Sequence, residues 1–406
     1  MRILTIGNMY PPHQLGGAEI VWQSWVEHAR AAGHEVRVLT SDVVIPGAVV
    51  SAASETGVAR TLRWYWEDHA FPKRSLPARV RLERENARTL ARELAAVRPD
   101  VVVWWAMAGM SFGLVERVRR AGVPMVAVLG DYWLTYGPDV DGWMAPFRSR
   151  PRLGAVAERL TGLPTSVDLG TGMHYVFISE TVRGRALEAF PGLPDHEVAN
   201  HGPDLSLFRP APRPDWSWKL LYLGRIDERK GVAVAVRALL RLPEEATLTI
   251  TGSGDEAHLD DLRALAASLG LGERVTFAGK RPRAELPGVL AAADALVFPV
   301  TWAEPWGLVP SEAMAVGLPV VGSGRGGSGE YMRDGENALL FDPEAGGPEA
   351  LAARLRELAA DPALRERLRT AGRATVEAIC ADDFDTRVQA AAARAASRTP
   401  TPPTDS

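Results

Sequence analysis

Two strongly apolar runs late in the chain, 295–300 and 318–322, flank a short polar loop and a segment of helical character. Each run is short and rich in valine, leucine or phenylalanine, which is typical of a strand buried in a parallel sheet. Pro310 favours the first turn of a helix. The spacing therefore predicts a strand, a loop that carries Glu304, a helix that carries Glu312 in its first turns, and a second strand.

The two carboxylates of this stretch suit a ligand with neighbouring hydroxyl groups. In an open parallel sheet, ligands bind where the carboxyl ends of the strands meet, and we expect Glu304 and Glu312 at that edge. A carboxylate accepts hydrogen bonds from adjacent sugar hydroxyls, and the N-terminus of the following helix favours phosphate. The stretch therefore predicts a nucleotide-sugar site. The alternative interpretation is that both carboxylates only cap the helix.

Two further motifs accompany this stretch. A turn with Gly16 and Gly17 follows the first predicted strand, and Arg225 and Lys230 follow a strand in mid-chain. Together with the two glutamates, which have seven residues between them, these motifs resemble the retaining glycosyltransferases of family 4. The resemblance spans almost the whole chain and is strongest over 220–342. It implies an α/β fold of GT-B architecture, with two facing Rossmann-like domains, parallel sheets and an interdomain cleft.

The resemblance also implies how the chain is divided. Residues 1–212 are expected to form an N-terminal, acceptor-binding domain, and residues 213–380 a C-terminal domain that binds the nucleotide sugar. A helix over 381–396 is expected to cross back to the first domain. The polar, proline-bearing tail 397–406 is expected to be disordered.

The implied activity is that of a retaining enzyme that moves a hexose-type sugar from a nucleoside-diphosphate sugar to an acceptor hydroxyl. The acceptor would be a glycan, a lipid-linked saccharide or a small natural product. Arg225 and Lys230 would neutralise the departing diphosphate, so neither a metal nor another cofactor is expected. Two alternatives stay open: a nucleotide-sugar epimerase of the same fold, and a non-catalytic partner protein that binds the donor.

Site roles are carried over from the resemblance residue by residue. The run 130–133 matches a His-Asp-Tyr-Trp-like motif of the family, except that Gly130 stands in place of the histidine. The role of the histidine is therefore not carried over, and the duty of Asp131 is left open. The expected catalytic residues are Arg225, Lys230, Glu304 and Asp131. The expected donor-binding residues are Gly16, Gly17, Gly252, Gly279, Lys280, Trp306, Gly307, Leu308, Val309 and Glu312.

Three other patterns are weaker. The acidic triplets 139–141 and 383–385 resemble the metal-binding triplet of another glycosyltransferase fold, but such triplets are common by chance and a loop role is favoured. The run 324–329 fits the dinucleotide fingerprint G-x-G-x-x-G. Because the helix and acid-ended strand that should follow are missing, we interpret it as a donor-side loop.

Composition bounds the partners and the location. A net charge of −4 over 406 residues gives no argument for nucleic acid. Cys380 is the only cysteine, which excludes an intramolecular disulfide and fits a cytoplasmic location. The arginine-rich, aromatic segment 60–88 would suit peripheral contact with the inner face of a membrane. Buried rings and a solvated helix face are the favoured interpretation of that segment, and the oligomeric state is not predicted.

Overall fold

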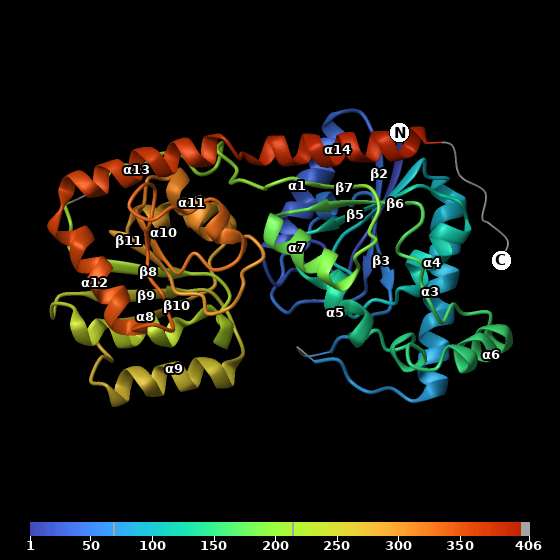
Figure 1. The fold of residues 1–406 in the computed structure, drawn as a ribbon, viewed down its shortest axis with the longest axis horizontal. Coiled ribbons are helices and arrows are strands. Elements are labelled where there is room, and N and C mark those ends of the chain that lie inside the picture. Colours follow the sequence, from blue (N-terminus) through green and yellow to red (C-terminus); the bar gives the residue numbers. More distant parts are fainter. Residues whose placement is uncertain (68–69, 213–214, 399–406) are drawn as a thin grey trace. The chain divides into compact units, whose positions relative to one another are not determined.

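The computed structural model describes residues 1–67, 70–212 and 215–398, which form two compact units (Figure 1). The first unit comprises Met1–Ala199 together with the described residues from Asp385 on, and the second comprises Asn200–Phe384. The division therefore falls before residue 200, whereas the sequence suggested a boundary after residue 212. The expected tail lies largely outside the described residues.

The segment 200–212 joins the second unit through its hydrogen bonds. The backbone N–H of Ala211 donates to the carbonyl oxygen of Val316 over 3.2 Å. The indole N–H of Trp306 donates to the carbonyl oxygen of His201. These bonds explain why a proline-rich stretch that resembles a linker belongs to the unit that follows it.

The first unit is built on a seven-stranded sheet of order β3-β2-β1-β4-β5-β6-β7, in which all neighbouring strands are parallel. Its strands are β1 (Arg2–Ile6), β2 (Glu35–Ser41), β3 (Val58–Leu62), β4 (Val101–Trp104), β5 (Met125–Leu129), β6 (Met173–Phe177) and β7 (His196–Val198). Its helices are α1 (Gly17–Ala31), α2 (Ala52–Glu55), α3 (Leu76–Val97), α4 (Gly113–Arg120), α5 (Trp133–Val140), η1 (Ala145–Phe147), α6 (Pro151–Thr161) and α7 (Glu180–Ala189).

The second unit is built on a six-stranded parallel sheet of order β10-β9-β8-β11-β12-β13. Its strands are β8 (Lys219–Leu223), β9 (Thr247–Thr251), β10 (Val275–Gly279), β11 (Ala295–Phe298), β12 (Val320–Gly322) and β13 (Leu339–Leu340). Its helices are η2 (Glu228–Lys230), α8 (Val232–Ala238), η3 (Leu239–Arg241), α9 (Glu256–Ser268), η4 (Arg283–Glu285), α10 (Leu286–Ala291), α11 (Leu308–Ala315), η5 (Gly327–Glu330), α12 (Gly347–Ala360) and α13 (Pro362–Glu377). In Figure 1, α11 and α13 lie on one side of this sheet and α8 and α9 on the other.

The last helix, α14 (Ala381–Ser397), belongs to the first unit from Asp385 on. The hydroxyl of Ser24 on α1 donates to Oδ2 of Asp385 over 2.7 Å. The guanidinium of Arg387 donates to the carbonyl oxygen of Val198 over 3.3 Å. None of the described helices is both long and apolar enough to cross a bilayer.

Burial of apolar side chains holds the helices of the first unit against its sheet. Strands β4, β5 and β6 are buried along their whole length, as expected for a sheet that helices cover on both faces. On one face Trp22 of α1 packs against Trp105, with ring centroids 6.1 Å apart, and its indole N–H donates to Thr5 of β1 over 2.9 Å. The aromatic side chains of α1 thus fasten this helix to the sheet.

Most of the aromatic rings of the segment 60–88 point into the first unit. Trp64 and Tyr65 are buried, and Trp66 stacks on Trp64 with ring centroids 4.9 Å apart. Phe71 is more exposed. The segment therefore offers solvent less aromatic surface than its composition suggests.

The side chains of the acidic triplet 139–141 turn to different partners. Asp139 forms an ion pair with Arg148, whereas Asp141 is buried and accepts hydrogen bonds from backbone N–H groups. The donors to Asp141 are the N–H groups of Phe112, Trp143 and Met144, at 2.8, 2.8 and 2.7 Å. Asp141 thus ties two loops together within the core.

Asp141 shares this interior with a second carboxyl group, that of Glu83 on α3. Glu83 is buried, and the hydroxyl of Tyr65 donates to its Oε1 over 2.9 Å. Burial, and then the nearby charge of Asp141, raise the pKa of Glu83 from 4.5 to about 8. Burial also raises the pKa of Asp141, against the three backbone hydrogen bonds. Between pH 4.5 and about 8, the folded protein therefore keeps a proton on this pair of carboxyl groups, whereas the unfolded chain has released it.

We predict that this pair lowers the stability of the protein at alkaline pH. The contribution of Glu83 is fully present below its unfolded-state pKa of 4.5 and is lost as the pH rises through about 8. Glu83→Gln keeps the acceptor for Tyr65 without the charge. Between pH 4.5 and about 8, the stability of the variant should therefore fall much less than that of the parent. Above pH 8, the variant should melt at least about 2 °C higher than the parent.

Differential scanning fluorimetry across a pH series measures the effect. Glu85→Gln is the matched control, because Glu85 is on the same helix but its pKa is lowered, mainly by its hydrogen bond with Arg81. A Glu83→Gln profile parallel to that of the parent would contradict the assignment.

Candidate active site

The order of the second sheet changes direction between two adjacent strands. The chain continues from β8 through β9 to β10 on one side, and from β11 through β12 to β13 on the other. The loops that leave β8 and β11 at the carboxyl edge therefore diverge, and open α/β sheets bind ligands at such a point. The first loop leads into η2, which ends at Lys230, and the second carries Glu304.

Lys230 and Glu304 form a largely buried ion pair. Nζ of Lys230 lies 2.6 Å from Oε2 of Glu304, and each side chain is only 12% exposed. The indole N–H of Trp302 donates to the same oxygen over 2.8 Å, and the ring centroid of Trp302 lies 5.5 Å from Nζ. The guanidinium of Arg229 packs on the same ring, 4.4 Å from its centroid. Two cations, one carboxylate and one aromatic ring are thus held together at the carboxyl edge of the sheet.

A glycine turn after β12 supports the backbone of Glu304. Gly326 has a φ of +70°, and a Cβ added to it would lie 2.4 Å from the carbonyl oxygen of Glu304. The N–H of Gly327 donates to that oxygen over 2.7 Å, and the N–H of Glu304 donates to the carbonyl oxygen of Arg325 over 3.3 Å. Only glycine permits both this conformation and this approach. The run 324–329 therefore holds the Glu304 loop, and its contact with a donor stays a prediction.

Glu312 is buried in α11 and paired with Arg283. Its Oε1 lies 2.8 Å from Nη1 of Arg283, and the guanidinium packs 5.2 Å from the ring centroid of Phe208. Burial raises the pKa of Glu312, and the charge of Arg283 opposes the rise. Because Oε1 already accepts from Arg283, a ribose hydroxyl would share that oxygen with Arg283 or would donate to Oε2.

The start of α11 is anchored by aromatic side chains. The ring centroid of Trp306 lies 5.0 Å from that of Tyr331, and the indole N–H is committed to the carbonyl oxygen of His201. The hydroxyl of Tyr331 donates to the carbonyl oxygen of Gly307, which precedes the helix with a φ of +84°. The helix then begins with the half-buried residues Leu308 and Val309. Trp306 therefore positions the loop and has no polar hydrogen left for a ligand.

The other expected donor-binding residues of the second unit follow the neighbouring strands. Arg225 comes after β8 and is 43% exposed, with its Nε 3.0 Å from Oδ2 of Asp227. Gly252 comes directly after β9, Gly279 ends β10, and the exposed Lys280 follows. All of them therefore lie at the same carboxyl edge as Lys230.

The remaining expected residues lie at the carboxyl edge of the first sheet. Gly16 precedes α1, Gly17 opens it, and the N–H of Gly16 donates to Glu19 over 3.1 Å. Asp131 follows β5 and accepts from the N–H of Trp133 over 2.8 Å and from the hydroxyl of Tyr136 over 3.3 Å. A Cβ added to Gly130 would meet no heavy atom within 4 Å, so the position has room for a side chain. The roles assigned to these residues stay predictions.

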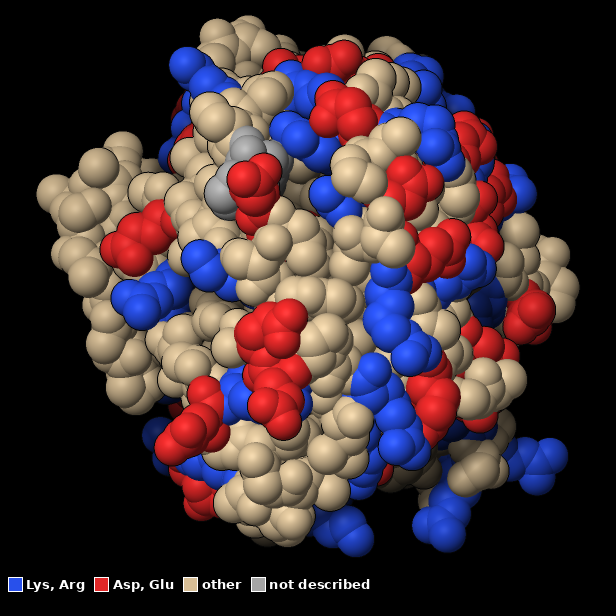
Figure 2. Space-filling view, turned by 90° about the vertical axis from the view of Figure 1, so that its left-hand side faces the viewer, with Lys and Arg blue, Asp and Glu red and all other residues tan. Residues whose placement is uncertain are grey.

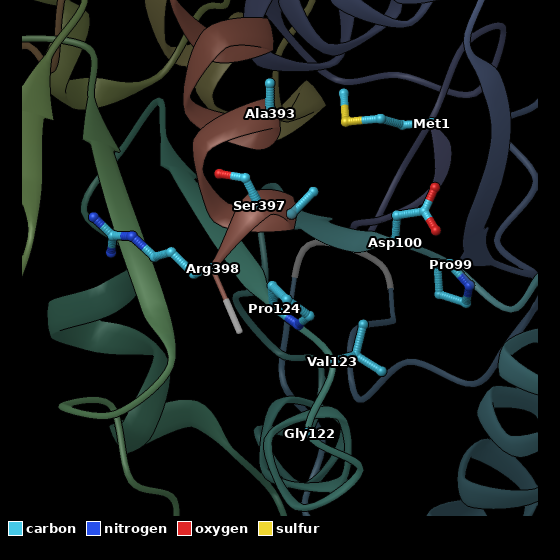
Figure 3. Close-up of a pocket in the computed structure, with 10 residues that line it drawn as sticks. Met1, Pro99, Asp100, Gly122, Val123, Pro124, Ala393, Ser397 and Arg398 are labelled. Carbon is cyan, nitrogen blue, oxygen red and sulfur yellow. The ribbon is translucent and has the colours of Figure 1, made fainter. Parts of the chain in front are cut away.

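A cavity of about 550 Å³ lies elsewhere, at the amino edge of the first sheet (Figure 3). Its labelled lining includes Met1, Asp100 and Arg398, and the two charged side chains are already paired. Asp100 binds Arg2 over 3.0 Å, and Arg398 pairs with Asp195. The α-amino group of Met1, which also lines the cavity, lies 3.2 Å from Nδ1 of His34. Among the described residues, no group of three or more His, Cys, Asp or Glu side chains could hold a metal ion.

Two residues of the second-unit site were missed by sequence reasoning. Arg283 binds Glu312 from 29 residues away, and no motif marks it. Trp302 could have been suspected, because it lies two residues before Glu304 at the end of a predicted strand.

Acidic and basic side chains are interspersed on the face of the molecule shown in Figure 2. The described residues of this face therefore form no broad basic surface of the kind that binds nucleic acid.

Comparison with known proteins gives the family. Residues 206–375 match the profile of the family described as glycosyl transferases group 1. The glycogen synthase of Mycobacterium tuberculosis is 30% identical over 421 residues, covering 97% of this chain and 93% of the relative. A GDP-mannose-dependent alpha-(1-6)-phosphatidylinositol monomannoside mannosyltransferase of the same species is 27% identical, covering 84% of this chain and 85% of the relative.

Solved structures give the fold. The sucrose-phosphate synthase of Thermosynechococcus elongatus has a TM-score of 0.72 at 22% identity, covering 97% of this chain and 98% of its own. Anabaena HepE in complex with UDP-glucose has a TM-score of 0.70 at 19% identity, covering 97% of this chain and 99% of the HepE chain. Membership of family 4 and retention of configuration stay predictions. The chain belongs to the group 1 glycosyl transferases and is a glycosyltransferase with the two-domain α/β fold of GT-B proteins, which confirms the fold and the activity class predicted from its motifs.

Proposed function

We propose that this glycosyltransferase moves a hexose-type sugar from a nucleoside-diphosphate sugar to an acceptor hydroxyl, with retention of configuration and without a metal ion. The observation that carries the proposal is the Lys230–Glu304 pair, an ammonium and a carboxylate held almost out of water at the carboxyl edge of the second sheet. An ammonium group can bind the negatively charged diphosphate, and a carboxylate can accept a hydrogen bond from a sugar hydroxyl. The proposed acceptor is a glycan, a lipid-linked saccharide or a natural product.

The donor class is supported by the similar proteins. Anabaena HepE is described in complex with UDP-glucose, and the mycobacterial mannosyltransferase is dependent on GDP-mannose. Both donors are nucleoside-diphosphate sugars, although they differ in base and in sugar. We therefore propose the class and name neither the base nor the sugar.

The hydrogen bonds of the pair leave capacity for such a donor. An ammonium has three N–H groups, and Lys230 directs one of them to Glu304. Oε2 of Glu304 accepts from both Lys230 and Trp302, whereas no described residue donates to Oε1. In the proposed complex, Oε1 accepts from a hydroxyl of the sugar, and the remaining N–H groups of Lys230 donate to the diphosphate.

The proposed reaction places acceptor and leaving group on one face of the sugar. The acceptor oxygen forms a bond to the anomeric carbon, while the bond from that carbon to the diphosphate breaks. The electron pair of the broken bond stays with the diphosphate, and a diphosphate oxygen takes the acceptor's proton. Fixed positive charge stabilises the departing oxygens. Lys230 and the half-exposed Arg225 would provide that charge.

We predict that Lys230→Ala and Arg225→Ala each reduce turnover by about 10² or more, which is typical of the loss of one electrostatic stabiliser. Lys219→Ala is the matched control, because Lys219 is an exposed lysine at the start of β8, on the same unit. Steady-state rates at saturating donor measure the effect, and circular dichroism checks the fold. Near-parental turnover in either variant would remove that residue from the mechanism.

The reaction class itself has a direct assay. With donor and acceptor in the presence of EDTA, we expect a glycoside whose anomeric configuration, read by NMR, equals that of the donor. With donor alone, we expect no epimeric sugar. Epimerisation of the donor alone would instead support an isomerase, and a loss of turnover in EDTA that Mg²⁺ or Mn²⁺ restores would contradict metal independence.

We predict different failures for the two glutamates. Glu304→Gln should lower turnover, because a misplaced sugar reacts slowly. It should not weaken binding of the bare nucleoside diphosphate, since Lys230 then loses a competing partner. Glu312→Gln should weaken that binding at least about tenfold, because charge-assisted hydrogen bonds contribute about 1.5–3 kcal/mol each. Calorimetric titration beside turnover measures both effects, and the opposite pattern would reverse the roles.

A further inference from the structure

Helix α6 (Pro151–Thr161) presents an apolar stripe outward from the first unit. Leu153, Val156 and Leu160 are 57, 56 and 78% exposed. Their spacing of three and four residues places them along one face of the helix. Figure 1 shows α6 at the periphery of the first unit. Single exposed apolar residues are ordinary on a protein surface, but a stripe along one helix face is a recognised sign of an interaction site.

The opposite face of α6 fixes this orientation. Gly154 is buried, and a Cβ added to it would lie 2.9 Å from Oγ1 of Thr165. Oε1 of Glu158 accepts from Arg120 over 2.6 Å, and its Oε2 accepts from the N–H of Thr165 over 3.1 Å. Gly154 and Glu158 are one helical turn apart, so the helix is anchored by this face and cannot turn its leucines inward.

Unpaired arginines border the stripe. Arg152 and Arg159 are exposed and flank Val156 along one side of the helix, and Arg150 precedes the first turn. None of these three side chains has a hydrogen bond or ion pair with another described residue. From 142 to 166 the chain holds four arginines and a single acidic residue, Glu158, whose carboxylate is directed inward. The exposed face of this helix is therefore apolar and positively charged.

We propose that α6 docks the first unit on a lipid surface with anionic headgroups, its leucine and valine side chains entering the boundary between headgroups and acyl chains. A helix with an apolar stripe beside arginines is the pattern of an interfacial membrane helix, and the arginines fit anionic phosphates by charge. A second copy of this chain fits less well, because facing α6 helices would bring arginines against arginines. This surface differs from the segment 60–88, in which Trp64 and Tyr65 point inward.

Vesicle flotation tests the proposal without donor or acceptor, so its result is independent of the proposed glycosyl transfer. The full chain should float with vesicles of phosphatidylcholine mixed with phosphatidylglycerol and should not float with phosphatidylcholine alone. Combined Arg150→Gln, Arg152→Gln and Arg159→Gln should weaken binding roughly fivefold per arginine at low salt. Combined Leu153→Ser, Val156→Ser and Leu160→Ser should weaken it at least about tenfold.

Two control variants replace exposed arginines by glutamine, or exposed apolar residues by serine, elsewhere on the surface. Arg237→Gln, Arg356→Gln and Arg367→Gln remove three exposed arginines from the second unit, and Val44→Ser, Val49→Ser and Val50→Ser remove three exposed valines from a loop of the first. Both controls should bind vesicles like the parent. No flotation with anionic vesicles, or equal binding by the α6 variants and the controls, would overturn the proposal. A dimer in light scattering that the α6 serine variant converts to a monomer would also overturn it, in favour of a self-interface.

Discussion

The Lys230–Glu304 ion pair is the interaction on which the carboxyl edge of the second sheet depends. Each charge is largely withdrawn from water, so each depends on the other and on Trp302 for compensation. Removing one member of such a pair leaves a buried charge without a partner, which is costly. The loops after β8, β11 and β12 all contribute to holding it, the last through the glycine turn behind Glu304.

This arrangement explains how a diphosphate could be received without large rearrangement. Lys230 is held in place before any ligand arrives, so the site does not have to order a long, flexible side chain during binding. Preorganised charge is more effective in catalysis than charge that must be assembled. Glu304 serves two purposes in this view: it compensates the ammonium, and it keeps one carboxylate oxygen for the sugar. The pair would thus connect the stability of the loop to the chemistry proposed for it.

Local spacing was enough to predict much of this site, whereas long-range pairing was not. The apolar runs and the loop between them predicted the strand, loop and helix around Glu304. The contact with Lys230, 74 residues away, depends on β8 and β11 being neighbours. The partner of Glu312 could not be foreseen, because Arg283 has no motif and its position is decided by folding. Local sequence patterns also did not predict that Asp141 is buried in the core or that Gly154 is on the buried face of α6.

A thermal-shift panel of nucleoside diphosphates and their sugars tests the central claim most directly, since a ligand that binds only the folded state raises the melting temperature. It should be run on the parent protein, on Lys230→Ala and on Lys219→Ala. At least one nucleoside diphosphate should stabilise the parent and Lys219→Ala, and its effect should be strongly reduced in Lys230→Ala. Equal stabilisation of all three proteins would contradict a donor site at Lys230, as would a panel in which no nucleotide has any effect on the parent.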